Sequence, residues 1–264
     1  MFQVGILLVG ALRAAREAAI YAAASRFIGV GTVALQGLSL AVAPQISAFL
    51  AKDQRQRARR IYQAGTWWLI VVSWPVYMSL IVFAPVLMRV FGREFVAGHT
   101  TLVILSVAML VLIGTGNNKI VLLMGGGSAW NLLVTGSSVT INIVLNLVLI
   151  PRFGMNGAAV AYATSIAYDN AFTAFLVWRL IGLHPFAKGW WVSVAGATLI
   201  YGGVGLAVRM AEGPTIRGFL LFAVVSTALY LPFLWRTRRL LQLSILKDAV
   251  RGGRGATRVR VAAP

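Results

Sequence analysis

The sequence has no cysteine and very few acidic residues. Of its 264 residues, six are aspartate or glutamate and two are histidine, His99 and His184. A chain without cysteine has no disulfide, no thiol nucleophile and no thiolate metal ligand. The two histidines are far apart and both lie next to expected loops. We therefore expect neither a metal site nor a cofactor.

Charged residues of either sign are also scarce, because they make up 11% of the chain, against about 25% in an average soluble domain. Hydrophobic residues make up 59%, and the mean hydropathy is +0.83. This composition indicates an integral membrane protein. The formal net charge of +18 does not favour nucleic acid as a partner, because the basic residues crowd into short segments beside apolar runs. That placement is typical of topology signals and of attraction to lipid headgroups.

Long apolar runs predict an all-α fold, a polytopic transmembrane helical bundle. A helix needs roughly 20 mainly apolar residues to cross a membrane, and by that measure we expect about seven full spans after one truncated N-terminal span. The truncated span is Phe2 to Leu12, and the full spans are Ala18 to Leu50, Gly65 to Phe91, Thr100 to Met124, Asn131 to Ile150, Gly157 to Ile181, Trp190 to Met210 and Ile216 to Trp235. Residues 236–264 form a basic tail, expected to be interfacial first and then disordered.

The distribution of lysine and arginine predicts the orientation, because cytoplasmic loops retain the excess of positive charge. Alternate connections, counted with the tail, hold sixteen basic residues on one side and seven on the other. The basic loop from Lys52 to Arg60 and the tail are therefore expected in the cytoplasm. The sequence predicts a multi-pass protein of the cell inner membrane, with the connection at Pro151 facing outward.

The stretch from Asn146 to Ala159 predicts a short turn between two membrane helices. Pro151 has no N–H to donate and ends the first helix, while Gly154 and Gly157 let the backbone turn tightly. This run, Asn-x-x-Leu-Ile-Pro followed by x-Phe-Gly-x-x-Gly-Ala-Ala, resembles one found in polysaccharide and lipid-linked oligosaccharide flippases. These flippases belong to the multidrug/oligosaccharidyl-lipid/polysaccharide exporter superfamily.

Three further segments resemble the same family and follow its order along the chain. The segment from Glu17 to Arg26 is similar to the family's Glu-Val-Gly-x-Tyr-x-x-Ala-x-Arg, with Ala19 in place of glycine. Pro44-Gln-Ile-Ser is similar to its Pro-x-Ile-Ser, and residues 91–98 are similar to its Phe-Gly-x-x-Phe-x-x-Gly outer loop. The resemblance implies that residues 1–235 form the C-terminal one of two six-helix lobes. We expect a gene fragment, a mis-assigned start or a half-protein that needs a partner, and we favour the first two.

Two polar stripes mark a candidate site on the helices before and after the turn. Their members, each set on one helical face, are Asn131, Thr135, Ser138, Asn142 and Asn146, and then Tyr162, Ser165, Asp169 and Thr173. Polar groups in hydrocarbon are costly unless they are paired or face water. The stripes therefore indicate either a shared cavity or hydrogen bonds between helices. Asp169, the only acidic residue near the middle of an expected span, could pair with a cation or respond to protons.

Two basic residues complete the candidate set. Arg26 lies about two turns into its span, where its guanidinium suits phosphate binding, although it could also snorkel or pair with Glu17. Lys119 lies near the cytoplasmic end of its span, where it either snorkels to the interface or contacts substrate. The substrate-binding candidates are Arg26, Asn118, Lys119, Asn142, Asn146, Tyr162 and Asp169.

No catalytic motif emerges, so we do not expect an enzyme. The resemblance implies a flippase that moves a polyprenyl-diphosphate-linked oligosaccharide or polysaccharide precursor by alternating access. Its partners would be the lipid-linked glycan, membrane lipids, and a polysaccharide polymerase or glycosyltransferases, with no nucleic acid. The alternatives are a non-transporting scaffold of a polysaccharide synthesis complex, a lipid II flippase, a drug exporter and a membrane glycosyltransferase.

Overall fold

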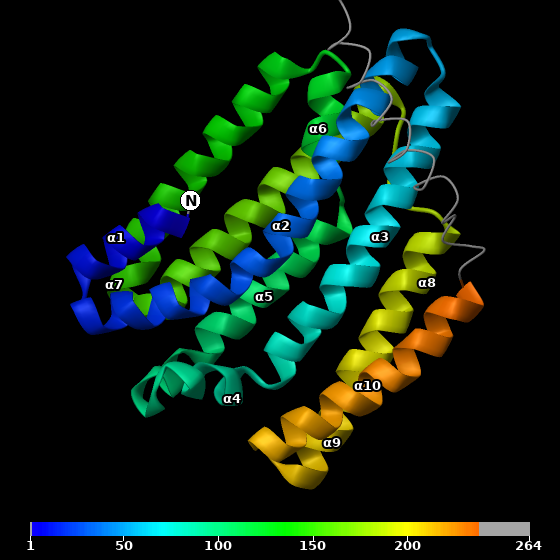
Figure 1. Cartoon of the computed structure of the whole chain (residues 1–264). Coiled ribbons are helices and arrows are strands. Elements are labelled where there is room, and N and C mark those ends of the chain that lie inside the picture. The colour runs from blue at the N-terminus through cyan, green and yellow to red at the C-terminus, as the bar shows by residue number, and fades with distance from the viewer. Residues whose placement is uncertain (1, 238–264) are drawn as a thin grey trace, which may run out of the picture.

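A computed structural model describes residues 2–237, and every element in this part of the chain is helical (Figure 1). This confirms the predicted all-α class. The predicted basic tail lies outside the described residues from position 238 onward. The elements are α1 (Phe2–Leu12), α2 (Ala15–Ala51), α3 (Arg55–Val82), α4 (Ala84–Met88), η1 (Arg89–Phe91), η2 (Arg93–Gly98), α5 (His99–Gly114), α6 (Asn118–Met124), α7 (Ser128–Leu176), η3 (Val177–Ile181), α8 (Lys188–Ala197), η4 (Thr198–Gly203), α9 (Val204–Glu212) and α10 (Ile216–Thr237).

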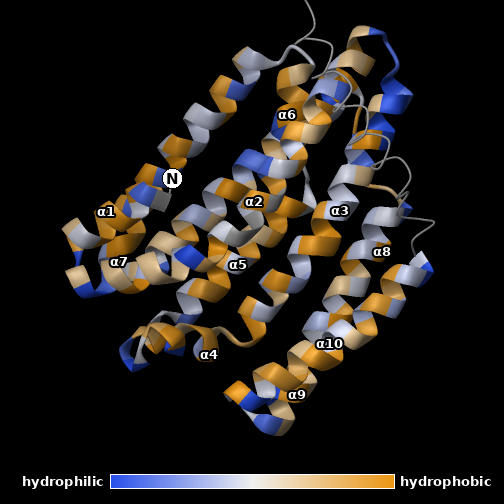
Figure 2. Cartoon of the chain, viewed as in Figure 1, coloured by the Kyte–Doolittle hydropathy of each residue, from blue (hydrophilic) through white to orange (hydrophobic). Residues whose placement is uncertain are grey.

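Within residues 2–237, five helical segments are long and apolar enough to cross a membrane, which makes this a multi-pass membrane protein. They are Arg55–Val82, Arg93–Met124, Ser128–Ile181, Lys188–Glu212 and Ile216–Thr237. Two shorter apolar helices, Gln3–Leu12 and Leu35–Ala51, accompany them. Figure 2 shows orange, hydrophobic residues along all the long helices, as expected for segments that cross a membrane.

Helix α7 is a hairpin of two arms rather than one straight helix. Its backbone leaves the helical conformation at Gly154, where φ is 56° and ψ is −137°, a combination that glycine tolerates best. At Gly157 an added Cβ would overlap the carbonyl of Leu149, so the returning arm starts in direct backbone contact with the first. The arms are joined further along by the hydrogen bond from Tyr168 to Ser137 (3.2 Å). The turn predicted around Pro151 is thus present.

The bundle has two ends, which we name by their connections. The kink end holds the α1–α2 connection, η1, η2, the α7 turn and the α9–α10 connection, and the basic end holds the α2–α3 connection (Figure 1). Between them, α1, α2, α3, α5 and α7 share the main hydrophobic core. Helix α5 contributes Leu102, Leu105 and Met109, each fully buried. A second cluster joins α3 to α8, α9 and α10 around Phe222.

The basic loop predicted from Lys52 to Arg60 is shorter than expected. The connection contains only residues 52–54, and α3 already begins at Arg55. Arginine and glutamine are good helix formers, so the basic run continues the helix out of the membrane instead of forming a loop. The turn itself is tight, because Asp53 has a positive φ of 52° and donates its N–H to the carbonyl of Leu50 (3.0 Å).

Candidate functional site

The predicted span from Thr100 to Met124 is interrupted by an unwound segment, residues 115–117, between α5 and α6. Gly116 has a φ of 65°, and a Cβ there would overlap the hydroxyl of Thr66 on α3. Two carbonyls released by the break are nevertheless satisfied. Trp190 Nε1 donates to Gly114 O (2.7 Å), and the Tyr62 hydroxyl donates to Thr115 O (2.8 Å). Irregular backbone at membrane depth is stable only where neighbouring groups bond it in this way.

Asparagine side chains around the break connect it to the second arm of α7. Asn118 Nδ2 donates to both oxygens of Asn170, the backbone O at 3.2 Å and Oδ1 at 3.4 Å. The Thr115 hydroxyl donates to the same Asn170 Oδ1 (2.8 Å). On the other side, the Ser39 hydroxyl of α2 donates to Asn117 Oδ1 (3.0 Å). The first turn of α6 is therefore bonded to α2 and to α7.

The next residue of α6 forms a partly buried ion pair with α7. Lys119 Nζ lies 2.9 Å from Asp169 Oδ1, and the Ser138 hydroxyl donates to the same oxygen (3.1 Å). Lys119 Nζ also reaches Thr135 Oγ1 (3.5 Å). The side chain of Asp169 is 3% exposed and that of Lys119 is 40% exposed. The lysine thus connects a carboxylate inside the bundle to the surface, and Ser138 and Thr135 bring the first arm of α7 into the same cluster.

The remaining candidates of the α7 hairpin lie closer to the kink. Asn146 Nδ2 donates to the backbone O (2.7 Å) and Oδ1 (3.2 Å) of Asn142 on the same arm. Both residues are 1% exposed. Asn142 Nδ2 and Asn146 Oδ1 are buried without a hydrogen-bond partner among residues 2–237. The antiparallel pairing of Ser138 with Asp169 brings these amides to the level of Tyr162, which is 6% exposed.

Arg26 does not join this cluster. It is an exposed residue of α2, and its neighbour Phe27 packs edge-on against Phe91 of η1, with ring centroids 5.4 Å apart. Arg26 therefore lies toward the kink end, whereas Lys119 lies beyond the break toward the basic end. Glu17, which the sequence offered as a partner for Arg26, instead accepts a hydrogen bond from the N–H of Met155 (3.1 Å).

Sequence reasoning brought Lys119 and Asp169 into the candidate set separately but missed the groups that hold the break. Tyr62, Trp190 and Asn170 were not candidates, although each bonds to the break or to the residues beside it. The run Gly114-Thr-Gly-Asn-Asn was the available signal, because two glycines and two asparagines in an apolar span disfavour a continuous helix.

The cluster is suited to binding and positioning, since an ammonium, a carboxylate, amides and hydroxyls are all hydrogen-bonding groups. In the described part of the chain, no three histidine, aspartate or glutamate residues are grouped so that they could hold a metal ion. The acidic residues other than Asp169 in residues 2–237 are Glu17, Glu94 and Glu212, which lie in terminal turns of helices, and Asp53, which lies in the α2–α3 connection.

Comparison with known proteins agrees with this architecture. Residues 1–151 match the MatE family. The chain is also similar to a protein of Haloferax volcanii described as "Probable low-salt glycan biosynthesis flippase Agl15", with 26% identity over 204 residues. The alignment covers 75% of this chain but 42% of that relative, so the chain spans less than half of the relative's length. The family resemblance of the sequence motifs is confirmed, and the chain belongs to the MatE family.

Proposed function

We propose that this chain is the C-terminal lobe of a flippase that moves a polyprenyl-diphosphate-linked oligosaccharide or polysaccharide precursor across the inner membrane. The observation that carries the proposal is the polar cluster around the α5–α6 break, which lies within the apolar segment Arg93–Met124. Ionisable residues inside membrane spans commonly mark substrate or ion pathways. Interrupted helices beside such groups are a recurring feature of transporter binding sites.

The roles of the candidate residues follow from their chemistry. Lys119, partly exposed and held by Asp169, can attract the diphosphate, and the carboxylate keeps the ammonium in place. Asn142 and Asn146 have buried amide atoms free to bond glycan hydroxyls when the hairpin arms part. Asn118 and Tyr162 flank these groups, and Arg26 would meet the phosphate from the kink end. No covalent bond is made or broken.

Transport would proceed by alternating access. Two lobes would rock about a shared basic cavity, with the basic end facing the cytoplasm and the kink end facing outward. Support for the substrate class comes from the motifs and from the glycan flippase relative, which this chain matches over 204 residues. A polysaccharide polymerase or glycosyltransferase would act on the delivered precursor.

The export test uses the native cells. We expect deletion of the gene, Arg26→Ala and Asp169→Asn each to lower surface glycan and to leave the lipid-linked precursor in the cytoplasmic leaflet, with membrane insertion of both variants intact. Lys52→Ala, which removes an exposed charge at the basic end, is the control and should export normally. Normal export after gene deletion would refute the function. Loss of export on deletion but not in the variants would favour the scaffold.

A second test measures water access and uses the natural absence of cysteine. Single cysteines at Asn142 and Asp169 should react with a water-soluble thiol reagent when the two lobes are assembled. A cysteine at Val148, which is 50% exposed on the outer surface of the bundle, should stay unreactive because lipid covers it. If the first two positions are as unreactive as the control, the site is a packed interface and not a transport cavity.

A further inference from the structure

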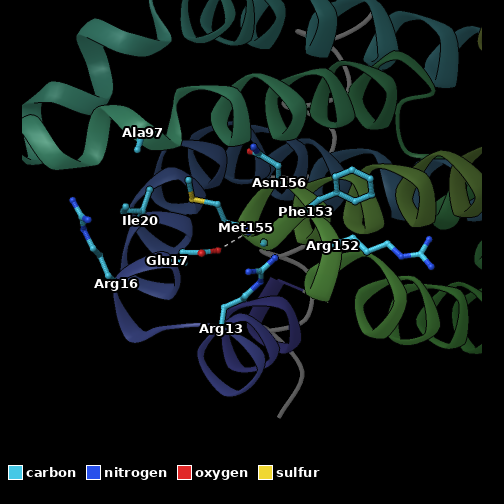
Figure 3. Close-up of a pocket in the computed structure, with 10 residues that line it drawn as sticks. Arg13, Arg16, Glu17, Ile20, Ala97, Arg152, Phe153, Met155 and Asn156 are labelled. Carbon is cyan, nitrogen blue, oxygen red and sulfur yellow. Dashed lines mark hydrogen bonds between the residues drawn. The ribbon is translucent and has the colours of Figure 1, made fainter.

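A second polar site lies at the kink end, away from the Lys119 cluster. It is a pocket of about 420 Å³ between the α1–α2 connection, η2 and the α7 turn (Figure 3), a volume within the usual range for ligand sites. Three arginines and one glutamate contribute to its lining: Arg13, Arg16, Arg152 and Glu17. With three positive charges and one negative charge, the lining has a net charge of +2.

Two of these charged groups build the pocket. Arg13 donates from Nε to Ile150 O (3.2 Å) and from Nη2 to Pro151 O (2.7 Å), the last carbonyls of the first α7 arm. Glu17 accepts the N–H of Met155 at the start of the second arm. A cation at a helix C-terminus and an anion at a helix N-terminus both match the helix dipole. Arg13 and Glu17 therefore fix the α7 turn against the α1–α2 connection.

The other two arginines have unused donors. Arg16 Nε lies 3.7 Å from Glu94 Oε2, with the two side chains 70% and 63% exposed, so this surface pair is weak. Arg152 is exposed and has no hydrogen bond or ion pair within residues 2–237. Figure 3 shows the two guanidinium groups extending on opposite sides of Arg13 and Glu17. The two groups point away from each other in Figure 3, but both side chains are long and exposed, so that each can turn toward an anion over Arg13 and Glu17.

The depth of the pocket indicates which anion. The first α7 arm, from Ser128 to Phe153, is about 39 Å long at roughly 1.5 Å per residue, longer than the roughly 30 Å thickness of the hydrocarbon and close to the thickness with the headgroups included. Its far end, where the pocket lies, is therefore at the level of lipid headgroups. Phosphate is the anion of that layer, and guanidinium groups bind it with paired, charge-assisted hydrogen bonds.

We propose that this pocket binds the phosphate group of a membrane lipid, with Arg16 and Arg152 as its ligands. The site does not rest on the proposed transport function, because a lipid phosphate can bind there whether or not the chain moves a glycan. The lipid is either a phospholipid of the surrounding leaflet or a polyprenyl phosphate.

The test measures lipid binding to the purified full chain by native mass spectrometry. The probes are phosphatidylglycerol, a polyprenyl phosphate and inorganic phosphate. Arg16→Gln with Arg152→Gln should weaken lipid binding at least about tenfold, since two charge-assisted contacts are lost. The matched control is Arg89→Gln with Arg217→Gln, which removes two exposed arginines of the same end. It should leave binding within about twofold, because neither residue lines the pocket and exposed charges are screened.

The two lipid probes distinguish the sources, and tighter binding of either lipid supports the site. Equal binding by the wild type and the pocket variant overturns it. Displacement of the lipid by an equal concentration of inorganic phosphate also overturns it, because the pocket would then be a site for free anions. If the pocket variant loses lipid binding but exports glycan normally, the lipid site is supported and is not needed for transport.

Glu17→Gln is expected to change the lipid affinity in the opposite direction. The amide oxygen can still accept the Met155 N–H, while the net charge of the lining rises. Lipid phosphate should then bind several-fold more tightly. Weaker or unchanged binding in a variant that keeps its thermal stability would refute the electrostatic basis of the site.

Discussion

The ion pair between Lys119 and Asp169 allows the most direct test of the interior. We consider Lys119→Met, Asp169→Asn and the double variant, each of which keeps side-chain volume roughly constant. Removing one member of a buried pair typically costs about 3–5 kcal/mol because the other charge remains buried, whereas replacing both members is often close to neutral.

The structure predicts that the two single variants lose different amounts of free energy of unfolding. Lys119→Met leaves the Asp169 carboxylate, 3% exposed, with the Ser138 hydroxyl as its donor, so a loss of about 3–5 kcal/mol is expected. Asp169→Asn leaves Lys119, whose side chain is 40% exposed and can extend its ammonium to water. That loss should be about 1–3 kcal/mol, the range for a buried polar group that loses a partner. The double variant should be more stable than Lys119→Met alone.

The assay is unfolding of the purified protein in mixed micelles of increasing SDS content, followed by circular dichroism. The cycle should give an interaction energy larger than the loss for Asp169→Asn, because the double variant is expected to be more stable than Lys119→Met alone. Lys52→Met, at an exposed position, is the control and should be within about 0.5 kcal/mol of the wild type. Additive losses, or a larger loss for Asp169→Asn than for Lys119→Met, would refute the buried pair.

Two predictions concern the α5–α6 break. Gly116→Ala should lower the free energy of unfolding by more than the roughly 1–3 kcal/mol of backbone strain at a positive φ, because its Cβ would also overlap a side chain of α3. The control is Gly29→Ala in α2, where a Cβ meets open space, and it should cost nothing in the same SDS titration. Tyr62→Phe should cost about 1–3 kcal/mol, since it leaves Thr115 O without its donor. Tyr168→Phe, at a half-buried position, should cost less than Tyr62→Phe, and the reverse order in thermal denaturation would argue against the break as a bonded element.

The sequence predicted the α7 hairpin well because the signals there are local. Pro151, Gly154 and Gly157 lie within seven consecutive positions, and the proline and first glycine act through their own backbone dihedrals. The polar stripes on the two arms also met as the helical period required, as the bond between Ser138 and Asp169 shows. The α5–α6 break was not predicted, because a hydropathy window of about 20 residues averages over a three-residue interruption.

The partner of Asp169 could not be predicted for a different reason. Lys119 is 50 positions away, and nothing in the local sequence of either residue specifies the other. Their meeting depends on the break, which sets the start and direction of α6, and on the register of the α7 hairpin. For Arg26, the sequence did not predict the position along the bundle. Its depth was estimated from an expected start at Ala18, but the first part of α2 packs beside η1, and span length alone does not reveal that contact.

The break also separates two helices that are attached to the bundle in different ways. Helix α5 is anchored in the main core by Leu102, Leu105 and Met109, whereas α6 is bonded to α7 through Asn118 and Lys119. The three unwound residues between them lack continuous helical hydrogen bonds, so they are the compliant point of this span. A displacement of the second α7 arm would therefore act on α6 through these bonds, and on α5 through the main core that α5 and this arm share. In this arrangement the ion pair couples α6 to the hairpin, and the tyrosine and tryptophan that bond the break fix the point about which α6 can turn.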